Sequence, residues 1–445
     1  MAKMRASFVC QACGTVTPKW LGRCPSCQAW ESLVEEPVVS TSPAKSISYK
    51  ITPLTEARQA QEPRAVTGIS ELDRVLGGGL VSGMVVLVGG EPGIGKSTLM
   101  LQLAASLGQS DSSILYVSAE ESARQVGRRA GRLGASGLEV MLLAETGLEA
   151  IQAAWREGAF RAVIVDSIQA VRAGDLAGAP GSVGQVRFCA AELANLAKET
   201  GTALFLVGHV TKEGSLAGPR VLEHLVDTVL YFESEPAMRL RLLRAVKNRF
   251  GATDEVGVFE MTEKGLAPVE NPSAVFLAHR PAEAPGSAVC AAMSGTRPLL
   301  VEVQALVSPS GLAMPRRQAL GVDPGRLNML CAVLSIHAGL DLSGHDVFVN
   351  LAGGIKLSEP AADLAVAVAV MSSLSNRPVP ADVVCFGEVG LAGELRAVGR
   401  SSARLAEAAR QGFSRALTAP GKQPKAGGMR VLSAARLDAA LELLR

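Results

Sequence analysis

The sequence predicts an α/β protein whose central domain is a parallel sheet with helices on both faces. The first observation is a series of continuous apolar segments that alternate with helical patterns between residues 61 and 271. Strands that are apolar along their whole length are typical of a sheet buried on both faces. The second is a glycine-rich loop at residues 90–97, between one such strand and a helical segment. The third is a pair of Cys-x-x-Cys motifs near the N-terminus, outside the α/β region.

Length and composition predict several regions. A chain of 445 residues exceeds one typical domain, and 48% hydrophobic residues suffice for several cores. We expect a four-cysteine zinc finger at 1–35, a linker rich in Ser, Thr, Pro and Ala at 36–60, the α/β domain at 61–271 and an α+β domain at 272–445. The net charge of +2 restricts any nucleic-acid surface to local patches. The sequence shows no signal peptide and no apolar segment of membrane-spanning length, so we expect a cytoplasmic protein without membrane contact.

The loop GEPGIGKS fits the phosphate-binding pattern G-x-x-x-x-G-K-[ST]. Its glycines let backbone N–H groups surround phosphates, and the N-terminus of the next helix adds a favourable partial charge. Lys96 is expected to reach the β- and γ-phosphates of ATP, and the hydroxyl of Ser97 to ligate Mg²⁺. The expected nucleotide contacts are Gly90, Glu91, Pro92, Gly93, Ile94, Gly95, Lys96, Ser97, Thr98 and Asp166.

Two carboxylates at the ends of later strands complete the expected site. Asp166 ends the segment AVIVD and is expected to hold the water shell of Mg²⁺. An aspartate in this place could instead cap the following helix. Glu120 ends SILYVSAE, at the edge of the sheet where ligands bind in such folds. It is the candidate group for orienting or activating water, and Glu121 is the alternative that the sequence leaves open.

Cys10, Cys13, Cys24 and Cys27 form two Cys-x-x-Cys pairs near the N-terminus. Such pairs can bring four thiolates to one tetrahedral Zn²⁺, and Gly14 permits the tight turn after the first pair. Four thiolates leave no open coordination position, so we expect a structural site. Residues 1–30 carry four cations and no acidic side chain, which suits contact with DNA or with a protein. The remaining cysteines stand singly in apolar surroundings and are expected to be buried: Cys189, Cys290, Cys331 and Cys385.

Residues 67–104 resemble the RecA-like ATPase superfamily, and the motif KNRFG at 247–251 is similar to that of the bacterial RadA (Sms) repair family. The resemblance extends over nearly the whole chain. It implies a RecA-like P-loop core that hydrolyses ATP, with Glu120 as the catalytic glutamate. It also implies a homo-hexameric ring in which Lys247 and Arg249 reach the γ-phosphate of a neighbouring subunit. Two cations at i and i+2 on a strand would project from the same face.

The same resemblance implies a DNA-dependent ATPase that processes recombination intermediates beside a RecA-type recombinase. Its partners would be single-stranded and branched DNA, and its action branch migration or helicase-like translocation. Residues 169–185, which are too rich in glycine for a packed element, and the segment after Gly208 are expected to form loops that face the channel of the ring. Neither contains an aromatic side chain. His209 matches the position that senses nucleotide state. Cations that could neutralise DNA phosphates there are Arg172, Arg187, Lys212 and Arg220.

Residues 272–445 resemble the proteolytic domain of Lon, which raises an ATP-dependent protease as an alternative function. The position of the Lon serine falls on Ala361 and that of the lysine on Ser402. Alanine has no nucleophile and serine cannot act as that base, so we expect no peptidase activity. A nucleotide-gated signalling ATPase, indifferent to DNA, is a further alternative. Candidate phosphate contacts in this domain are Arg316, Arg317, Lys356 and Arg396.

Overall fold

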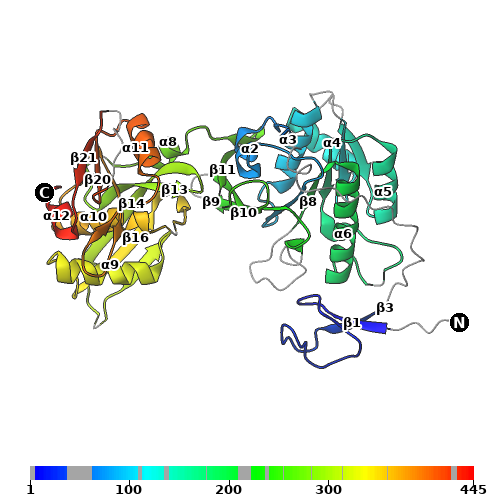
Figure 1. The fold of residues 1–445 in the computed structure, drawn as a ribbon, viewed down its shortest axis with the longest axis horizontal. Helices are drawn as coiled ribbons and strands as arrows, with labels where there is room; N and C mark the ends of the chain where they lie inside the picture. Colours follow the sequence, from blue (N-terminus) through cyan, green and yellow to red (C-terminus); the bar gives the residue numbers. More distant parts are fainter. Residues whose placement is uncertain are drawn as a thin grey trace, which may run out of the picture. The chain divides into compact units, whose positions relative to one another are not determined.

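Figure 1 shows the computed structural model, in which a small N-terminal sheet, a nine-stranded sheet and a seven-stranded sheet follow one another along the chain. The chain divides into two compact units, Met1–Ser234 with Arg239–Pro268, and Glu235–Met238 with Val269–Arg445. None of the helices described is long and apolar enough to cross a membrane. The structure describes residues 6–37, 63–108, 113–134, 140–176, 178–208, 222–235, 240–253, 255–281, 283–312, 314–357, 359–421 and 428–444.

The N-terminal sheet has three antiparallel strands in the order β2-β1-β3. They are β1 (Ala6–Cys10), β2 (Val16–Thr17) and β3 (Leu33–Pro37). Its buried cluster consists of Cys10, Cys24 and Leu33, with few partly buried neighbours. A core of this size is too small to stabilise a fold alone, so these strands depend on the metal that their cysteines can bind. Of the expected linker at 36–60, only residues 36 and 37 lie within the described part, at the end of β3.

The nine-stranded sheet has the order β12-β11-β10-β9-β4-β8-β7-β5-β6. Strands β4 to β9 are parallel wherever their pairing is described, and β10, β11 and β12 form an antiparallel edge. The predicted α/β fold with a parallel sheet is therefore confirmed. The strands are β4 (Val85–Gly90), β5 (Ile114–Ser118), β6 (Val140–Ala144), β7 (Ala162–Asp166), β8 (Ala203–Val207), β9 (Thr228–Glu235), β10 (Leu240–Asn248), β11 (Val256–Thr262) and β12 (Gly265–Pro268).

Helices cover both faces of this sheet because successive side chains of its buried strands point to opposite sides. Val86 and Val88 of β4 join a cluster with α2, α3 and α4. Val85 and Leu87 join a second cluster with α5 and α6 on the other face. The helices are α2 (Ser70–Leu76), α3 (Lys96–Gly108), α4 (Ala123–Arg132), α5 (Leu148–Glu157), the 3₁₀ turn η1 (Ile168–Ala170) and α6 (Val183–Thr200).

Three local expectations for this unit need correction. Strand β6 lies at the edge of the sheet, and Met141 is 60% exposed, so this apolar segment is not covered on both faces. Strand β10 ends at Asn248, so Arg249 lies beyond the strand. The alternation of side chains along a strand therefore does not place Arg249 on the same face as Lys247. The segment 169–185 is not one open loop: η1 begins it, α6 takes up its end, and the buried amide of Gln185 bonds the backbone of Ala173.

The second unit is built on a seven-stranded sheet in the order β15-β16-β14-β13-β17-β20-β21. Strands β13, β17, β20 and β21 are parallel, and β13, β14 and β16 are antiparallel to one another in turn. The strands are β13 (Ser287–Ser294), β14 (Arg297–Pro309), β15 (Arg317–Leu320), β16 (His345–Leu351), β17 (Val383–Phe386), β20 (Arg415–Thr418) and β21 (Arg430–Ser433), with the separate hairpin β18 (Glu388–Val389) and β19 (Leu395–Arg396).

Two helices of this unit are α9 (Pro324–His337) and α10 (Asp363–Ser375). Helix α9 starts where the carboxylate of Asp323 accepts the backbone N–H of Arg326 at 2.8 Å, with a proline in the first turn. Helix α10 is apolar on all sides and buried over most of its length, as expected of a helix inside a core. The other helices are α8 (Pro272–Leu277), η3 (Ala352–Gly354), η4 (Pro360–Ala362), α11 (Ser401–Arg410) and α12 (Leu437–Glu442).

Candidate nucleotide site and metal centre

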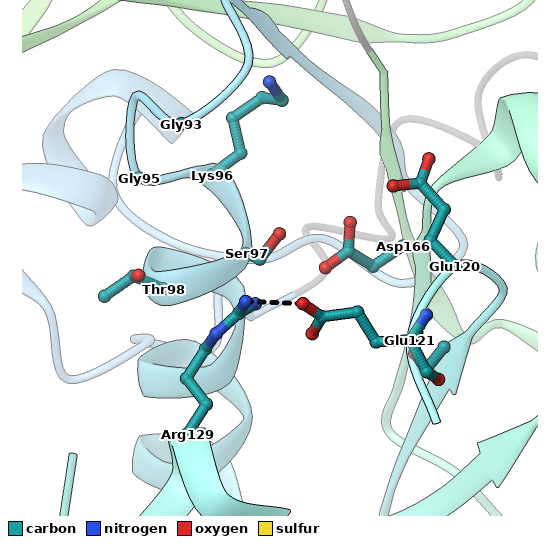
Figure 2. Close-up of a pocket in the computed structure, with 10 residues that line it drawn as sticks. Gly93, Gly95, Lys96, Ser97, Thr98, Glu120, Glu121, Arg129 and Asp166 are labelled. Carbon is teal, nitrogen blue, oxygen red and sulfur yellow. Dashed lines mark hydrogen bonds and ion pairs between the residues drawn. The ribbon is translucent and has the colours of Figure 1, made fainter. Parts of the chain in front are cut away.

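The phosphate loop connects the carboxyl end of β4 to the first turn of α3. Gly93 has φ +76° and Gly95 has φ +120°, backbone conformations that side-chain-bearing residues rarely adopt. A cleft of about 290 Å³ opens at this loop. It is lined by Gly93, Gly95, Lys96, Ser97, Thr98, Ser118, Glu120, Glu121, Arg129 and Asp166 (Figure 2). The structure therefore brings the loop and the three candidate carboxylates together around one space.

Lys96 is buried at the first position of α3, and its Nζ donates to the carbonyl oxygens of Gly90 at 2.8 Å and Glu91 at 3.0 Å. Burial lowers the pKa of Lys96, while the charges of Asp166 and Glu120 oppose that shift. Carbonyl oxygens are neutral acceptors, so these two bonds orient the ammonium group without cancelling its charge. This arrangement suits a lysine that binds the phosphates of a nucleotide.

Asp166 ends β7 at the cleft, and its Oδ2 accepts the hydroxyl of Tyr116 on the neighbouring strand β5 at 2.6 Å. Burial, with the adjacent carboxylate, raises the pKa of Tyr116 well above its usual value, so the tyrosine is a hydrogen-bond donor at neutral pH. This hydrogen bond holds one carboxylate oxygen of Asp166 in place, and the neutral tyrosine does not cancel the negative charge of the carboxylate. Asp166 and Ser97 supply carboxylate and hydroxyl oxygens, the donor types that Mg²⁺ prefers, so the residues present fit that ion.

Glu120 and Glu121 are distinguished by their partners. Ser118 holds the turn that carries both: its hydroxyl donates to the carbonyl of Glu121 at 2.7 Å and accepts that residue's N–H at 3.2 Å. The carboxylate of Glu121 forms an ion pair with Arg129 at 2.7 Å (Figure 2). Glu120 instead accepts the hydroxyl of Ser167, which follows Asp166. Glu121 is thus neutralised by an arginine, and the hydroxyl of Ser167 holds Glu120 beside the predicted metal ligand.

Arg129 reaches the cleft because α4 begins at a capping box. The Ser122 side chain accepts the N–H of Gln125, and the Gln125 side chain accepts the N–H of Ser122 at 2.9 Å. Arg129 then lies in the second turn of α4 and lines the cleft (Figure 2). The sequence interpretation missed Arg129, Ser118, Tyr116 and Ser167. The capping box was visible in the sequence, but nothing there indicated which arginine of α4 would face inward.

Lys247 and Arg249 lie away from this cleft. Lys247 Nζ donates to the carbonyl oxygens of Glu223 at 2.6 Å and Val226 at 2.8 Å. Arg249 pairs with Asp227 at 3.2 Å, and the other oxygen of Asp227 accepts the N–H of Val85, the first residue of β4. The phosphate loop follows the last residue of β4. The two cations and the phosphate loop therefore lie at opposite ends of the same strands.

The residues predicted to contact DNA differ in exposure and in their interaction partners. Arg172 and Arg187 are exposed, whereas His209, Lys212 and Arg220 lie outside the described residues. In the second unit, Arg317 is engaged with backbone carbonyls, including that of Leu342 at 2.6 Å. Arg396 pairs with Glu388 and Glu394. The other two cations predicted there, Arg316 and Lys356, are exposed.

The residues at the positions of the Lon dyad cannot act as a nucleophile and a base in peptide hydrolysis. The methyl group of Ala361 is fully buried in a core cluster of the second unit. Ser402 is an exposed residue in the first turn of α11. Neither residue provides a nucleophile next to a base.

The four N-terminal cysteines converge on one point. Their sulfur atoms all lie within 4.8 Å of one another, with Cys10–Cys27 and Cys13–Cys24 both at 3.6 Å. A tetrahedral zinc with Zn–S bonds of about 2.3 Å requires S···S distances of about 3.8 Å, so the cysteines fit Zn²⁺. A hydrogen bond from the backbone of Cys27 lowers the pKa of the Cys24 thiol to about 6, which favours the thiolate form. The other four cysteines are buried, as predicted.

Family models match three parts of the chain. A model described as an AAA domain matches residues 52–215, one described as a rubredoxin metal binding domain matches 8–35, and one described as subunit ChlI of Mg-chelatase matches 330–422. These matches agree with the RecA-like P-loop core, the N-terminal zinc ribbon and the Lon-like C-terminal unit. The AAA match and the four-cysteine cluster also agree with ATP and Zn²⁺ as the ligands of the two sites.

Several curated proteins are about half identical over nearly the full length. DNA repair protein RadA of Pseudomonas aeruginosa is 52% identical over 453 residues and covers 100% of both chains. The protein of the same name from Bacillus subtilis is 51% identical, covering 93% of this chain and 92% of its own. Among solved structures, a KaiC-like protein from Pyrococcus horikoshii is 18% identical with a TM-score of 0.39, covering 47% of this chain and 99% of its own.

Proposed function

The chain belongs to the family of DNA repair protein RadA, and from this membership we propose that it is a DNA-dependent ATPase that processes recombination intermediates. The observation that carries the proposal is the cleft in which Lys96, Asp166 and Glu120 surround the phosphate loop. These are the groups that phosphoryl transfer requires: a cation for the phosphates, oxygen ligands for a metal, and a carboxylate near the attacking water.

Each side chain of the cleft has a distinct role in this proposal. The backbone of residues 90–98 surrounds the phosphates, and Lys96 neutralises the β- and γ-phosphates. Ser97 and Asp166 would hold Mg²⁺, which would neutralise phosphate charge during transfer. Glu120 orients the attacking water and accepts its proton, because Ser167 holds its carboxylate in the cleft beside Asp166. Glu121 is excluded from that role by its ion pair with Arg129.

Lys247 and Arg249 act on a neighbouring subunit. They lie at the amino end of the strands whose carboxyl end carries the phosphate loop, so they cannot reach the nucleotide of their own chain. Head-to-tail packing of identical subunits brings opposite ends of two copies together and closes into a ring when the rotation allows it. A homo-hexamer satisfies this requirement. Cations supplied in trans then stabilise the charge of the transition state.

The nucleic acid that the ring acts on is single-stranded and branched DNA. Arg172, which follows η1, and Arg187, in α6, are exposed and provide phosphate contacts without sequence preference. Hydrolysis would drive branch migration or translocation, beside a RecA-type recombinase in the cytoplasm. An ATP-dependent protease is disfavoured because Ala361 and Ser402 replace the dyad. A signalling ATPase would hydrolyse ATP at a rate independent of DNA.

The test measures ATP hydrolysis and branch migration with and without single-stranded DNA for the wild type, Lys96→Ala and Lys247→Ala. We expect DNA to stimulate the wild type, Lys96→Ala to lose hydrolysis by at least about 100-fold, and Lys247→Ala to lose both activities. Lys198→Ala, an exposed lysine of α6, is the matched control and should behave as wild type. Wild-type hydrolysis that does not respond to DNA would contradict the proposal.

A mixing experiment isolates the trans contact. An equal mixture of Lys96→Ala and Lys247→Ala subunits restores an intact site only where a Lys247→Ala subunit binds ATP and a Lys96→Ala neighbour supplies the cation. Random assembly makes about one quarter of the interfaces intact, so about one quarter of the wild-type rate should return. A mixture no more active than its two components would rule out action in trans.

A further inference from the structure

The zinc ribbon carries an exposed aromatic pair that neither the metal nor the nucleotide site uses. Trp20 is 55% exposed and Trp30 is 72% exposed. Tryptophan is the largest apolar side chain, and two of them in a domain of about thirty residues would normally form its core. Here the core is made by Cys10, Cys24 and Leu33 instead. An exposed aromatic cluster on so small a domain indicates a binding surface.

The two indole rings are held next to each other by the fold. A Cβ placed on Gly22 would lie 3.8 Å from the Trp20 ring and 3.9 Å from the Trp30 ring, so both rings flank this glycine. Arg23 and Trp30 pair in an isolated antiparallel bridge, and the N–H of Glu31 donates to the carbonyl of Gly22 at 2.9 Å. These backbone contacts flank the loop that carries Cys24 and Cys27. They therefore hold Trp30 and Gly22 next to the four-cysteine site.

Cations adjoin the aromatic pair. The guanidinium of Arg23 lies over the Trp30 ring, 5.6 Å from its centroid. Its Nε and Nη2 donate to Gln28 at 2.8 and 2.6 Å, which fixes the guanidinium in place. Lys19, next to Trp20, is exposed. Flat rings beside fixed positive charge match the two parts of a nucleotide, a base that stacks and a phosphate that is anionic.

We propose that Trp20, Trp30 and Arg23 form a platform on which the bases of single-stranded DNA stack, with Lys19 and Arg23 next to the phosphates. The inference deepens the proposed DNA-dependent function by placing a base-contacting site on the ribbon, separate from the ATPase cleft. Stacking is indifferent to sequence because every base has an aromatic face. Double-stranded DNA keeps its bases inside, so the platform selects single strands. Glu31, which follows Trp30 in the chain, carries the opposite charge and would weaken phosphate binding.

Tryptophan fluorescence gives a direct measurement on the full-length, zinc-loaded protein. The chain has three tryptophans, and Trp155 is buried in the ATPase core, so most of the solvent-sensitive emission comes from the ribbon. The probes are an oligodeoxythymidine of about 20 nucleotides and an abasic strand of equal length, which keeps the phosphates and lacks the bases. We expect the first to quench the emission and the second, at concentrations where it is bound, to leave it unchanged.

Substitutions then assign the signal. Trp20→Ala with Trp30→Ala should weaken binding of a labelled oligonucleotide, measured by anisotropy without ATP, by at least about tenfold. The conservative Trp20→Phe with Trp30→Phe should retain most of the affinity and lose the quenching. Glu31→Gln should bind about twofold tighter. One zinc per chain and an unchanged DNA-free ATPase rate confirm that each variant is folded.

Two outcomes would overturn the platform. The first is bound oligonucleotide, seen by anisotropy, with no change in emission. The second is equal DNA affinity for wild type and the double alanine variant, which would assign the surface to a protein partner. Lys96→Ala separates this inference from the proposed function: it should lose hydrolysis and keep the quenching. If DNA quenches the emission of the wild type but does not change its ATPase rate, the platform is supported and the proposed DNA-dependent ATPase function is contradicted.

Discussion

The two compact units each place a charged residue at the first position of a helix, and they treat that charge in opposite ways. Lys96 begins α3 and is held by the neutral carbonyls of Gly90 and Glu91. Asp363 begins α10 and is held by the guanidinium of Arg326 through two hydrogen bonds, one of them 2.9 Å long. The first charge is held by carbonyl dipoles at the phosphate loop, where the carboxylates of Asp166 and Glu120 also act on it. The second is neutralised inside the protein.

The same contrast extends to the surrounding clefts. In the ATPase cleft of about 290 Å³, neutral carbonyls and hydroxyls orient Lys96, Asp166 and Glu120. A cleft of about 160 Å³ in the second unit contains Glu359 and Asp363, and an arginine pairs with each of them. Removing one partner of a buried ion pair is strongly destabilising because the other charge is left uncompensated. The ion pairs of this cleft therefore stabilise the fold of the second unit.

Removing a structural charge should cost stability and leave hydrolysis intact. Arg404 is 3% exposed and bonds Glu359 through two nitrogens, at 2.9 and 2.6 Å, and the carbonyl of Ala291 at 2.6 Å. Arg404→Ala leaves Glu359 without its cation, which should lower the free energy of unfolding of this unit by about 3–5 kcal/mol. The exposed pair of Arg396 with Glu394 is the matched control, and Arg396→Ala should cost about 1 kcal/mol or less.

Two spectroscopic signals separate the units in a denaturant titration of the full chain. All three tryptophans and all three tyrosines lie before residue 269, so tryptophan and tyrosine fluorescence reports on the first unit only. Circular dichroism reports on both. In Arg404→Ala the dichroism transition should move to lower denaturant while the fluorescence transition stays in place. A fluorescence shift of equal size would show that the two units unfold together and would contradict the division of roles.

The general architecture was predictable from the sequence because it follows from short-range patterns. Continuous apolar segments identify buried parallel strands, and GEPGIGKS identifies the loop between β4 and α3. Partners between distant segments follow no such pattern. Arg129 meets Glu121 only because the capping box at Ser122 sets the direction of α4. The exposure of β6 depends on its place at the sheet edge, which composition does not encode.

The pair Lys247 and Arg249, proposed to act in trans, illustrates the same limit. Alternation on an extended strand predicted that Lys247 and Arg249 share one face, but β10 ends between them at Asn248. Asn248 uses its side chain to accept the N–H of Phe250 at 2.9 Å and to donate to the carbonyl of Val75 at 3.1 Å, and these contacts turn the chain out of the sheet. The two cations are held by different groups, the loop carbonyls and Asp227. Their proposed joint action depends on the neighbouring subunit.

Neutralising one carboxylate at a time tests which acid of the ATPase cleft is available for chemistry. Glu120→Gln should lower kcat by about 100-fold, equivalent to about 2.7 kcal/mol, with little change in ATP affinity, because the amide cannot accept a proton from water. Glu121→Gln should lower kcat by less than about tenfold, since Arg129 already compensates that charge. The opposite ranking in steady-state ATPase assays would assign the catalytic role to Glu121.

The smallest expected effect concerns a buried thiol of the second unit. Burial raises the pKa of Cys385 to about 12. An unfolded thiol ionises near about pH 8.5. Above that pH the unfolded chain loses the proton that folded Cys385 retains, so this thiol reduces stability progressively until pH reaches its folded pKa. Between about pH 8 and about pH 9.5 the loss is about 1 kcal/mol per buried thiol.

The free energy of unfolding of the second unit should therefore fall by about 1 kcal/mol less over that pH interval in Cys385→Ala than in the wild type. Circular dichroism measures it. The change of stability with pH is compared, and not the stability at one pH, because the cavity left by the missing sulfur lowers stability equally at each pH. Cys189→Ala is the counterpart in the first unit, where burial also raises the pKa to about 12. Its slope change should appear in the fluorescence transition. An unchanged slope in both variants would mean that these thiols keep the same proton in the folded and unfolded chains.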